Sequence, residues 1–154
     1  STIWLARALP PPPQGRLISL EVNPTHAEVA RTNVARAGLS GVVEVRLGRA
    51  LDTLPRLVGE ATDPFDLIFI DADKENIPEY FGWSLRLSRP GTLIAVDNVV
   101  RGGGVIDDTT DDPSIRGIRR LNQVIAAEPR VTATTLQLVG SKGYDGLTLA
   151  LVTG

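Results

Sequence analysis

Four short apolar runs, separated by helix-like segments, constrain the fold of this chain more than any other feature of its sequence. They are residues 17–22, 42–47, 65–70 and 92–96. Each run is bounded by turn-forming residues and has the length of a strand, so each is predicted to be a buried parallel strand. Strands that alternate with helices form a doubly wound sheet with right-handed crossovers. The expected fold class is therefore α/β.

Helices are predicted between these strands, together with a short helix at the start of the chain, over residues 2–9, 24–37, 50–59, 77–87 and 113–127. Asn23 and Asp112 each precede a proline, which is the pattern of an N-cap followed by Pro at the first helical position. Residues 131–139 and 147–152 alternate like strands. The seven residues between them are too few for a crossover, so this pair is predicted to be antiparallel. Residues 101–112, rich in Gly and Asp, are predicted to form a loop.

Composition excludes several functional classes. A chain of 154 residues is expected to form a single domain, residues 1–154. The net charge is −2 and no basic block is present, which argues against nucleic acid as the partner. No apolar run approaches the roughly 20 residues of a membrane span. The chain has no Cys, which excludes a disulfide scaffold and a thiol nucleophile. We therefore expect a cytoplasmic protein with neither nucleic acid nor membrane as its partner.

Polar side chains follow the third and fourth apolar runs, at the sheet edge where ligands bind in such folds. Asp71 comes directly after the third run, and Asp97 and Asn98 come directly after the fourth. Two carboxylates and one amide oxygen suit a Mg²⁺, Mn²⁺ or Ca²⁺ ion that keeps open positions for water or substrate. Caps on the following helices are the alternative, and the two readings are evenly balanced for each Asp alone. Their joint occurrence favours a metal site.

Two further residues accompany this candidate metal site. Lys74 lies beside it in the sequence and could act as a general base. Asp73 fits well with a simple role at the start of the next helix.

Acidic and small residues mark the ends of the first two runs. Glu21 ends the first run, where a carboxylate commonly accepts hydrogen bonds from ribose hydroxyls; equally, its charge could complement the helix that starts at Pro24. Gly48 and Ala50 follow the second run and would let an adenine ring approach the backbone, although a turn without a ligand is favoured on these residues alone. The acidic residues of 107–112 are better explained as a solvated loop that caps the next helix than as a calcium site.

Together, these segments resemble the cation-dependent O-methyltransferases of the catechol and caffeoyl-CoA type, which use S-adenosylmethionine and have a Rossmann-like sheet. The resemblance extends over essentially the whole chain. Its most specific part is Ile-Asp-Ala-Asp-Lys followed one strand later by Asp-Asn. The matching segments are residues 1–6, 17–21, 23–24, 48–51, 65–74, 96–98 and 143–147.

The resemblance implies a role for each candidate residue. Asp71, Asp97 and Asn98 match ligands of a divalent cation, with Mg²⁺ preferred over Mn²⁺ and Ca²⁺, and Lys74 matches the catalytic residue that takes the proton from the substrate hydroxyl. Glu21 matches the carboxylate that holds the cofactor ribose. The full set implied to bind S-adenosylmethionine is Ser1, Glu21, Val22, Gly48, Arg49, Ala50, Asp71 and Asp73.

The resemblance also implies an activity and an assembly. The activity is methyl transfer from S-adenosylmethionine to a hydroxyl of a catechol-like vicinal diol, and the assembly is a homodimer. Family members carry a strand and a Gly-rich loop before the segment that matches Ser1. We therefore expect a Rossmann-like sheet that lacks its first, central strand, in an N-terminally truncated piece of a longer polypeptide. A non-catalytic binding or oligomerisation module that retains the fold is the alternative.

Overall fold

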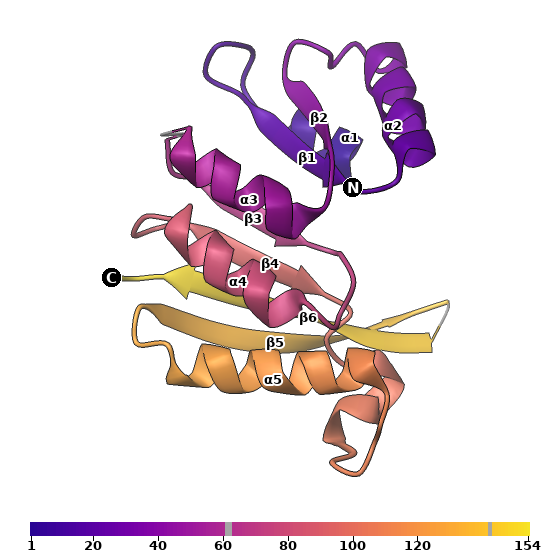
Figure 1. The fold of residues 1–154 in the computed structure, drawn as a ribbon, viewed down its shortest axis with the longest axis vertical. Coiled ribbons are helices and arrows are strands. Elements are labelled where there is room, and N and C mark those ends of the chain that lie inside the picture. Colours follow the sequence, from indigo (N-terminus) through magenta and orange to yellow (C-terminus); the bar gives the residue numbers. More distant parts are fainter. Residues whose placement is uncertain (61–62, 142) are drawn as a thin grey trace. The chain divides into compact units, whose positions relative to one another are not determined.

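The computed structural model describes residues 1–60, 63–141 and 143–154. None of the helices in these ranges is both long enough and apolar enough to cross a bilayer. In chain order the elements are α1 (Thr2–Arg7), β1 (Leu17–Glu21), α2 (Pro24–Arg36), β2 (Val43–Leu47), α3 (Ala50–Gly59), β3 (Leu67–Ile70), α4 (Ile77–Arg86), β4 (Leu93–Asp97), the 3₁₀ helix η1 (Arg101–Ile106), α5 (Pro113–Ala127), β5 (Val131–Gly140) and β6 (Gly143–Val152) (Figure 1).

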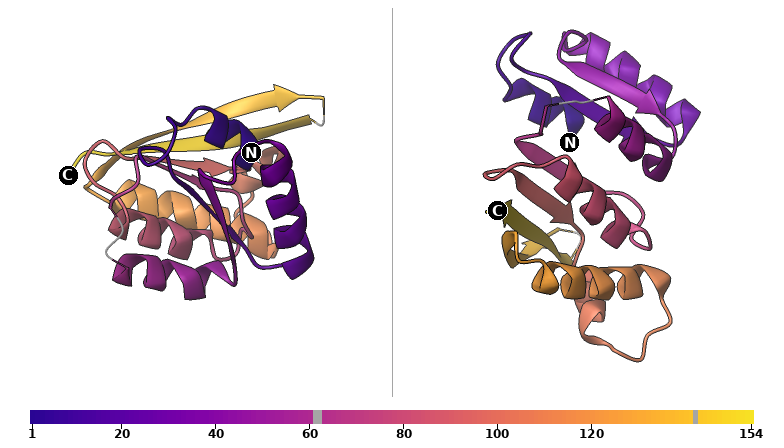
Figure 2. Two further views of the ribbon diagram at one scale, coloured as in Figure 1. Left: turned by 90° about the horizontal axis from the view of Figure 1, so that it is seen from above. Right: turned by 60° about the vertical axis from the view of Figure 1, so that its left-hand side comes forward.

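The larger sheet has the strand order β3-β4-β6-β5. β3 and β4 are parallel, whereas β6 runs antiparallel to both β4 and β5, so the predicted antiparallel pair is confirmed. Helices α4 and α5 lie on one face of this sheet (Figure 2). The fully buried apolar side chains of this unit include Ile94 and Val96 of β4, Phe81 of α4, and Ile118 and Leu121 of α5.

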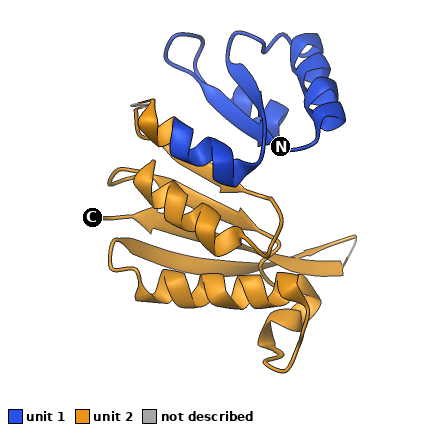
Figure 3. Ribbon diagram, viewed as in Figure 1, with its two compact units in different colours: residues 1–56 blue, residues 57–154 orange. Residues whose placement is uncertain are grey.

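The chain divides into two compact units, Ser1–Arg56 and Leu57–Gly154 (Figure 3). In the smaller unit, β1 and β2 pair in parallel with Leu17 opposite Val43. Their core is small and is formed by Ala6, Val34 and Val43. The mixed α/β class and the parallel pairs agree with the doubly wound fold that the sequence predicts.

The predicted helix caps are confirmed. The Asn23 side-chain oxygen accepts the backbone N–H groups of Thr25 and His26 at the start of α2. The Asp112 carboxylate accepts those of Ser114 and Ile115 at the start of α5. Each cap precedes a proline that needs no N–H partner, so the sequence locates both helix starts correctly.

Two loop predictions were wrong. β6 begins at Gly143, so residues 140–146 are not one long loop: Tyr144 pairs with Val139 and Asp145 pairs with Leu138. Cross-strand pairing with β5 overrides the turn-like composition of this segment. Lys142, within the predicted loop, lies outside the described residues. The first half of the predicted loop 101–112 forms η1.

The boundaries and burial of the strands also differ from prediction. β3 begins at Leu67, because the Phe65 N–H instead donates to the Leu87 carbonyl, and β4 continues through Asp97. The four parallel strands were predicted to be buried. The centre of β4 is buried, but Leu47 of β2 and Leu67 of β3 are 49% and 42% exposed. Both residues are on strands that have a single hydrogen-bonded neighbour in the described sheets, so they lack a covering strand on one side.

Candidate functional site

The register of β3 and β4 brings the predicted cation ligands to one edge of the larger sheet. Ile70 pairs with Val96 in this parallel register. Asp71 and Asp97 are the next residues on the two neighbouring strands. The carboxyl ends of adjacent parallel strands therefore bring both carboxylates to the same edge, as the sequence predicts.

Lys74 links the two strand ends. Its side chain is only 8% exposed, and its Nζ atom lies 3.3 Å from Asp71 Oδ1. The same atom donates a hydrogen bond to the Asp97 carbonyl oxygen at 3.0 Å. A buried ammonium is tolerated only when its protons have acceptors, and these two oxygen atoms accept two of its three protons. The structure thus brings Asp71, Lys74 and Asp97 together.

Asn98 has an uncommon backbone conformation directly after β4. Its φ angle is 59°, in the left-handed region that Asn tolerates better than most residues. Its N–H donates to Asp97 Oδ1 at 2.8 Å, which orients that carboxylate.

These residues could hold a hard divalent cation. Their donor set consists of the carboxylates of Asp71 and Asp97 and the side-chain amide of Asn98, and Asp71 is half exposed, so water or a ligand can reach it. Within residues 1–60, 63–141 and 143–154, no three His, Cys, Asp or Glu side chains form a metal-binding group. A cation here would therefore depend on two carboxylates, one amide oxygen and oxygen atoms from solvent or substrate.

Asp73 is held at the start of α4. Its two carboxylate oxygens accept hydrogen bonds from the Tyr80 hydroxyl and the Asn76 side-chain amide, both at 2.5 Å. Burial acts to raise the pKa of Asp73, but these hydrogen bonds outweigh it and hold the pKa below its ordinary value. The N-cap residue of α4 is Asn76, so Asp73 holds side chains near the start of this helix and is not the cap that the sequence suggested.

A clamp that the sequence did not predict holds the chain after Asn98. Asp145 Oδ1 accepts the backbone N–H groups of Val100, Arg101 and Gly146, each at 2.9 Å. The Tyr144 hydroxyl donates to the Gly102 carbonyl at 2.7 Å. We call Tyr144 and Asp145 the β6 clamp. The sequence signals were their position between two glycines, Gly143 and Gly146, and the family resemblance of residues 143–147, neither of which identified these contacts.

In the smaller unit, β1 and β2 bring Glu21 and Gly48 together. The Gly48 N–H donates to the Glu21 carbonyl at 2.9 Å. Gly48 has φ 146°, which disfavours a side chain at this turn. The Glu21 carboxylate accepts the Asn23 N–H at 2.8 Å, immediately before α2. Glu21 therefore assists the start of this helix, and its half-buried side chain lies at the strand end where a ribose was predicted.

The remaining predicted cofactor residues also lie in the smaller unit. Ser1 is the exposed N-cap residue of α1. Val22 is 63% exposed directly after β1. Arg49 is exposed, and its carbonyl accepts a hydrogen bond from the Thr53 hydroxyl at 3.0 Å in the first turn of α3, where Ala50 is half-buried.

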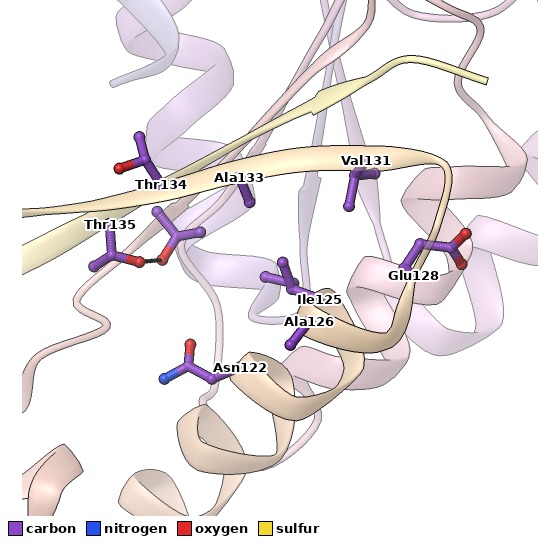
Figure 4. A pocket seen from close by; sticks show the side chains of 9 residues that line it. Asn122, Ile125, Ala126, Glu128, Val131, Ala133, Thr134 and Thr135 are labelled. Atoms are coloured by element: carbon purple, nitrogen blue, oxygen red, sulfur yellow. Dashed lines mark hydrogen bonds between the residues drawn. The ribbon is translucent and has the colours of Figure 1, made fainter.

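A separate groove lies between α5 and β5 (Figure 4). Its volume is about 380 Å³, and its lining includes Asn122, Glu128 and Thr134. Thr135 and Thr148 line it as well and share a hydrogen bond of 2.7 Å between their hydroxyls. None of the predicted site residues lines this groove, so the sequence assigns it no role.

Comparison with known proteins identifies the family. The family model described as O-methyltransferase matches residues 1–152. The chain is 57% identical to a catechol O-methyltransferase of Niastella koreensis, over 99% of this chain and 68% of that protein. It is 54% identical to a catechol O-methyltransferase of Mycobacterium tuberculosis, over 99% of this chain and 66% of that protein.

Solved structures agree with this similarity. The O-methyltransferase from Bacillus cereus, in complex with SAH, superposes with a TM-score of 0.95 at 58% identity. TomG from Streptomyces achromogenes, an O-methyltransferase involved in tomaymycin synthesis and solved in complex with SAM, gives a TM-score of 0.95 at 54% identity. In both cases the match covers 99% of this chain and 68% of the other. The chain thus spans about two thirds of the length of these relatives. It belongs to the O-methyltransferase family and has the Rossmann-like fold of S-adenosylmethionine-dependent enzymes.

Proposed function

We propose that the polypeptide containing this sequence transfers a methyl group from S-adenosylmethionine to one hydroxyl of a catechol-like small molecule. The observation that carries this proposal is the position of Lys74 between Asp71 and Asp97 at the carboxyl ends of β3 and β4. The names of the two catechol O-methyltransferase relatives support the class of acceptor. The relatives solved with SAM or SAH support the methyl donor.

We assign a divalent cation to Asp71, Asp97 and Asn98, with Mg²⁺ preferred over Mn²⁺ and Ca²⁺. All three ligands offer oxygen, which these hard cations favour. When bound, such a cation lowers the pKa of hydroxyl groups that coordinate it.

Lys74 is the residue that we assign to the acceptor proton. Its Nζ atom is buried and held by two oxygen acceptors at the same strand ends. Once the ammonium has given up one proton, the neutral amine has a lone pair in a fixed position from which to take a hydroxyl proton. A fixed base contributes through proximity and orientation, because the reacting groups need not search for each other.

The cofactor residues have positioning roles in this proposal. The Glu21 carboxylate accepts hydrogen bonds from the ribose hydroxyls, and Ser1 binds the methionine carboxylate. Gly48 and Ala50, with Arg49, flank the adenine, because small residues at the β2–α3 turn let a flat ring approach the backbone. Asp73 lies toward the sulfonium end, and Val22 and Asp71 are the further residues assigned to cofactor binding. We further propose that the protein is cytoplasmic and acts as a homodimer. Light scattering of the purified protein would test the dimer.

The direct test is a methyl-transfer assay with catechol and S-adenosylmethionine on the full natural polypeptide. We expect EDTA to abolish turnover and added Mg²⁺ to restore it. Asp97→Asn should lower activity by about 100-fold or more, because it removes a charged ligand of the cation and the loss of a residue that only supports such a ligand already costs about 10- to 100-fold. Asp108→Asn changes an exposed residue of the acidic loop and should leave activity unchanged.

Turnover that survives chelation would remove the cation from the proposal. Full activity of Asp97→Asn would remove Asp97 from the ligand set. A polypeptide that binds S-adenosylmethionine calorimetrically but methylates no vicinal diol would instead support a binding module.

A further inference from the structure

Gly117 of α5 makes an unusually close backbone contact with the loop that carries Lys74. Gly117 is buried, and a Cβ atom built on it would lie 2.0 Å from the Lys74 carbonyl oxygen. It would also lie 2.8 Å from the Lys74 carbonyl carbon and 3.1 Å from Glu75 Cα. All three neighbours are backbone atoms, so no side-chain rotation could make room. Only a glycine permits α5 to approach this loop so closely.

The same helix holds the loop at a second point, one turn further on. The Arg120 guanidinium donates to both carboxylate oxygens of Glu79, at 2.7 and 2.9 Å. It also reaches the Glu75 carbonyl at 3.4 Å. Residues 117 and 120 are three apart and so lie on one face of α5. That face therefore contacts the chain on both sides of Glu75.

Gly82 of α4 provides the contrast. It is also a glycine inside a helix, but a Cβ atom built on it would meet nothing within 4 Å. Glycine in a helix costs about 1 kcal/mol relative to alanine. At Gly82 the structure shows no steric need for a glycine. At Gly117 the close contact with the Lys74 backbone requires one despite this cost.

We propose that Gly117 is a positioning residue for Lys74. Close packing of α5 against the Lys74 carbonyl fixes the distance of the Lys74 backbone from α5. At this position of the backbone, Nζ reaches both the Asp71 carboxylate and the Asp97 carbonyl. A methyl group at residue 117 would force the loop away from α5 by a distance comparable with a bond length. This inference rests on the proposed role of Lys74 as the base.

The test compares Gly117→Ala with Gly82→Ala in the full natural polypeptide. Gly117→Ala should lower kcat on the order of 100-fold, since a displacement near 1 Å has that effect on a positioned group. The KM for S-adenosylmethionine should be little changed. Gly82→Ala should retain wild-type kcat and gain some stability.

A double-mutant cycle with Lys74→Ala separates positioning from general packing. If Gly117 acts through Lys74, the Gly117→Ala change should lower kcat no further when Lys74 is already absent. Equal losses in both backgrounds would show a merely structural role and overturn the inference.

A second readout needs no turnover. Lys74 is only 8% exposed, so acetic anhydride should acetylate it slowly in the wild-type protein, as followed by peptide mass spectrometry. Gly117→Ala should speed this labelling, and Gly82→Ala should not. Arg120→Gln changes a half-exposed residue at the other contact point and should speed it to a smaller extent, which keeps the test open if Gly117→Ala does not fold.

The outcomes distinguish this inference from the proposed function. Unchanged acetylation of Lys74 in the folded variants would overturn the positioning role of Gly117. Wild-type turnover of Lys74→Ala would overturn the base assignment, while the labelling rates would still report on whether α5 fixes the loop.

Discussion

At the residue scale, Lys74 is unusual because its side-chain amine is buried. Removal of an amine from water is unfavourable unless its protons are matched. The Asp71 carboxylate and the Asp97 carbonyl provide two acceptors for Nζ, within 3.3 and 3.0 Å. The side chain is therefore held in one place instead of moving freely in solvent.

Substitution of Lys74 can separate a base from a fixed positive charge. Lys74→Arg keeps a cation but replaces the amine with a guanidinium that does not lose its proton in proteins. We expect Lys74→Ala and Lys74→Arg both to lower kcat by about 100-fold or more, the usual contribution of general base catalysis. Calorimetry should show little change in the Kd for S-adenosylmethionine. High activity of Lys74→Arg would indicate that charge alone is needed.

At the scale of elements, the β6 clamp joins the end of the chain to the segment that follows β4. Burial acts to raise the pKa of Asp145, but the N–H groups of Arg101, Val100 and Gly146 outweigh it and hold the pKa below its ordinary value. Hydrogen bonds to the charged form are thus stronger in the folded protein than in the unfolded chain, where water replaces them.

This lowered pKa predicts how stability changes with pH. A carboxyl group whose pKa is lower in the folded state stabilises the protein fully above its unfolded pKa, near 3.9 for Asp. That stabilisation is lost as the pH falls through the folded pKa. Asp145→Asn should therefore reduce the free energy of unfolding at pH 7, and the difference from wild type should shrink below about pH 4.

Urea unfolding at pH 7, 5 and 3 would measure this difference. Asp108→Asn, in the exposed acidic loop, serves as the control with no expected change at pH 7. A deficit of Asp145→Asn that stays constant from pH 7 to pH 3 would show that the charge of Asp145 does not stabilise the clamp.

The sequence predicted the local features of these elements better than their distant contacts. The prediction that Asn23 and Asp112 cap helices was correct, because a cap depends only on backbone groups two or three residues away. The meeting of Asp71 with Asp97 was predictable because parallel strands end at one edge. The β6 clamp was missed, because Asp145 binds groups 44 and 45 residues away. Gly117 was missed for a related reason: a helical glycine does not reveal what packs against it.

At the scale of the whole molecule, the proposed cofactor residues are divided between the two compact units, whereas the proposed cation residues all belong to the larger one. Glu21 and Gly48 lie within Ser1–Arg56, and Asp71 and Asp97 lie within Leu57–Gly154. Each group follows the ends of a parallel strand pair. A ligand that binds only the native state stabilises the part of the protein that has to be folded for binding.

Linkage between cofactor and folding therefore tests Glu21. S-adenosylmethionine at 100 times its Kd should raise the free energy of unfolding of the full natural polypeptide by about 2.7 kcal/mol. Glu21→Gln should lose most of this gain, because it removes the carboxylate proposed to bind ribose. Glu28→Gln, at an exposed residue of α2, should keep it. Urea unfolding with and without S-adenosylmethionine gives both values, and an undiminished gain in Glu21→Gln would exclude Glu21 from the cofactor site.

The β6 clamp contacts only part of the segment that follows β4, which leaves the rest of that segment open to redesign. Tyr144 and Asp145 fix the backbone only as far as Gly102, and the following residues 107–109 are exposed, as are 111–113. A segment exchange confined to residues 107–111 would leave both the clamp and the Asp112 cap of α5 in place. Libraries built there can therefore vary this exposed segment without disturbing the residues assigned to chemistry.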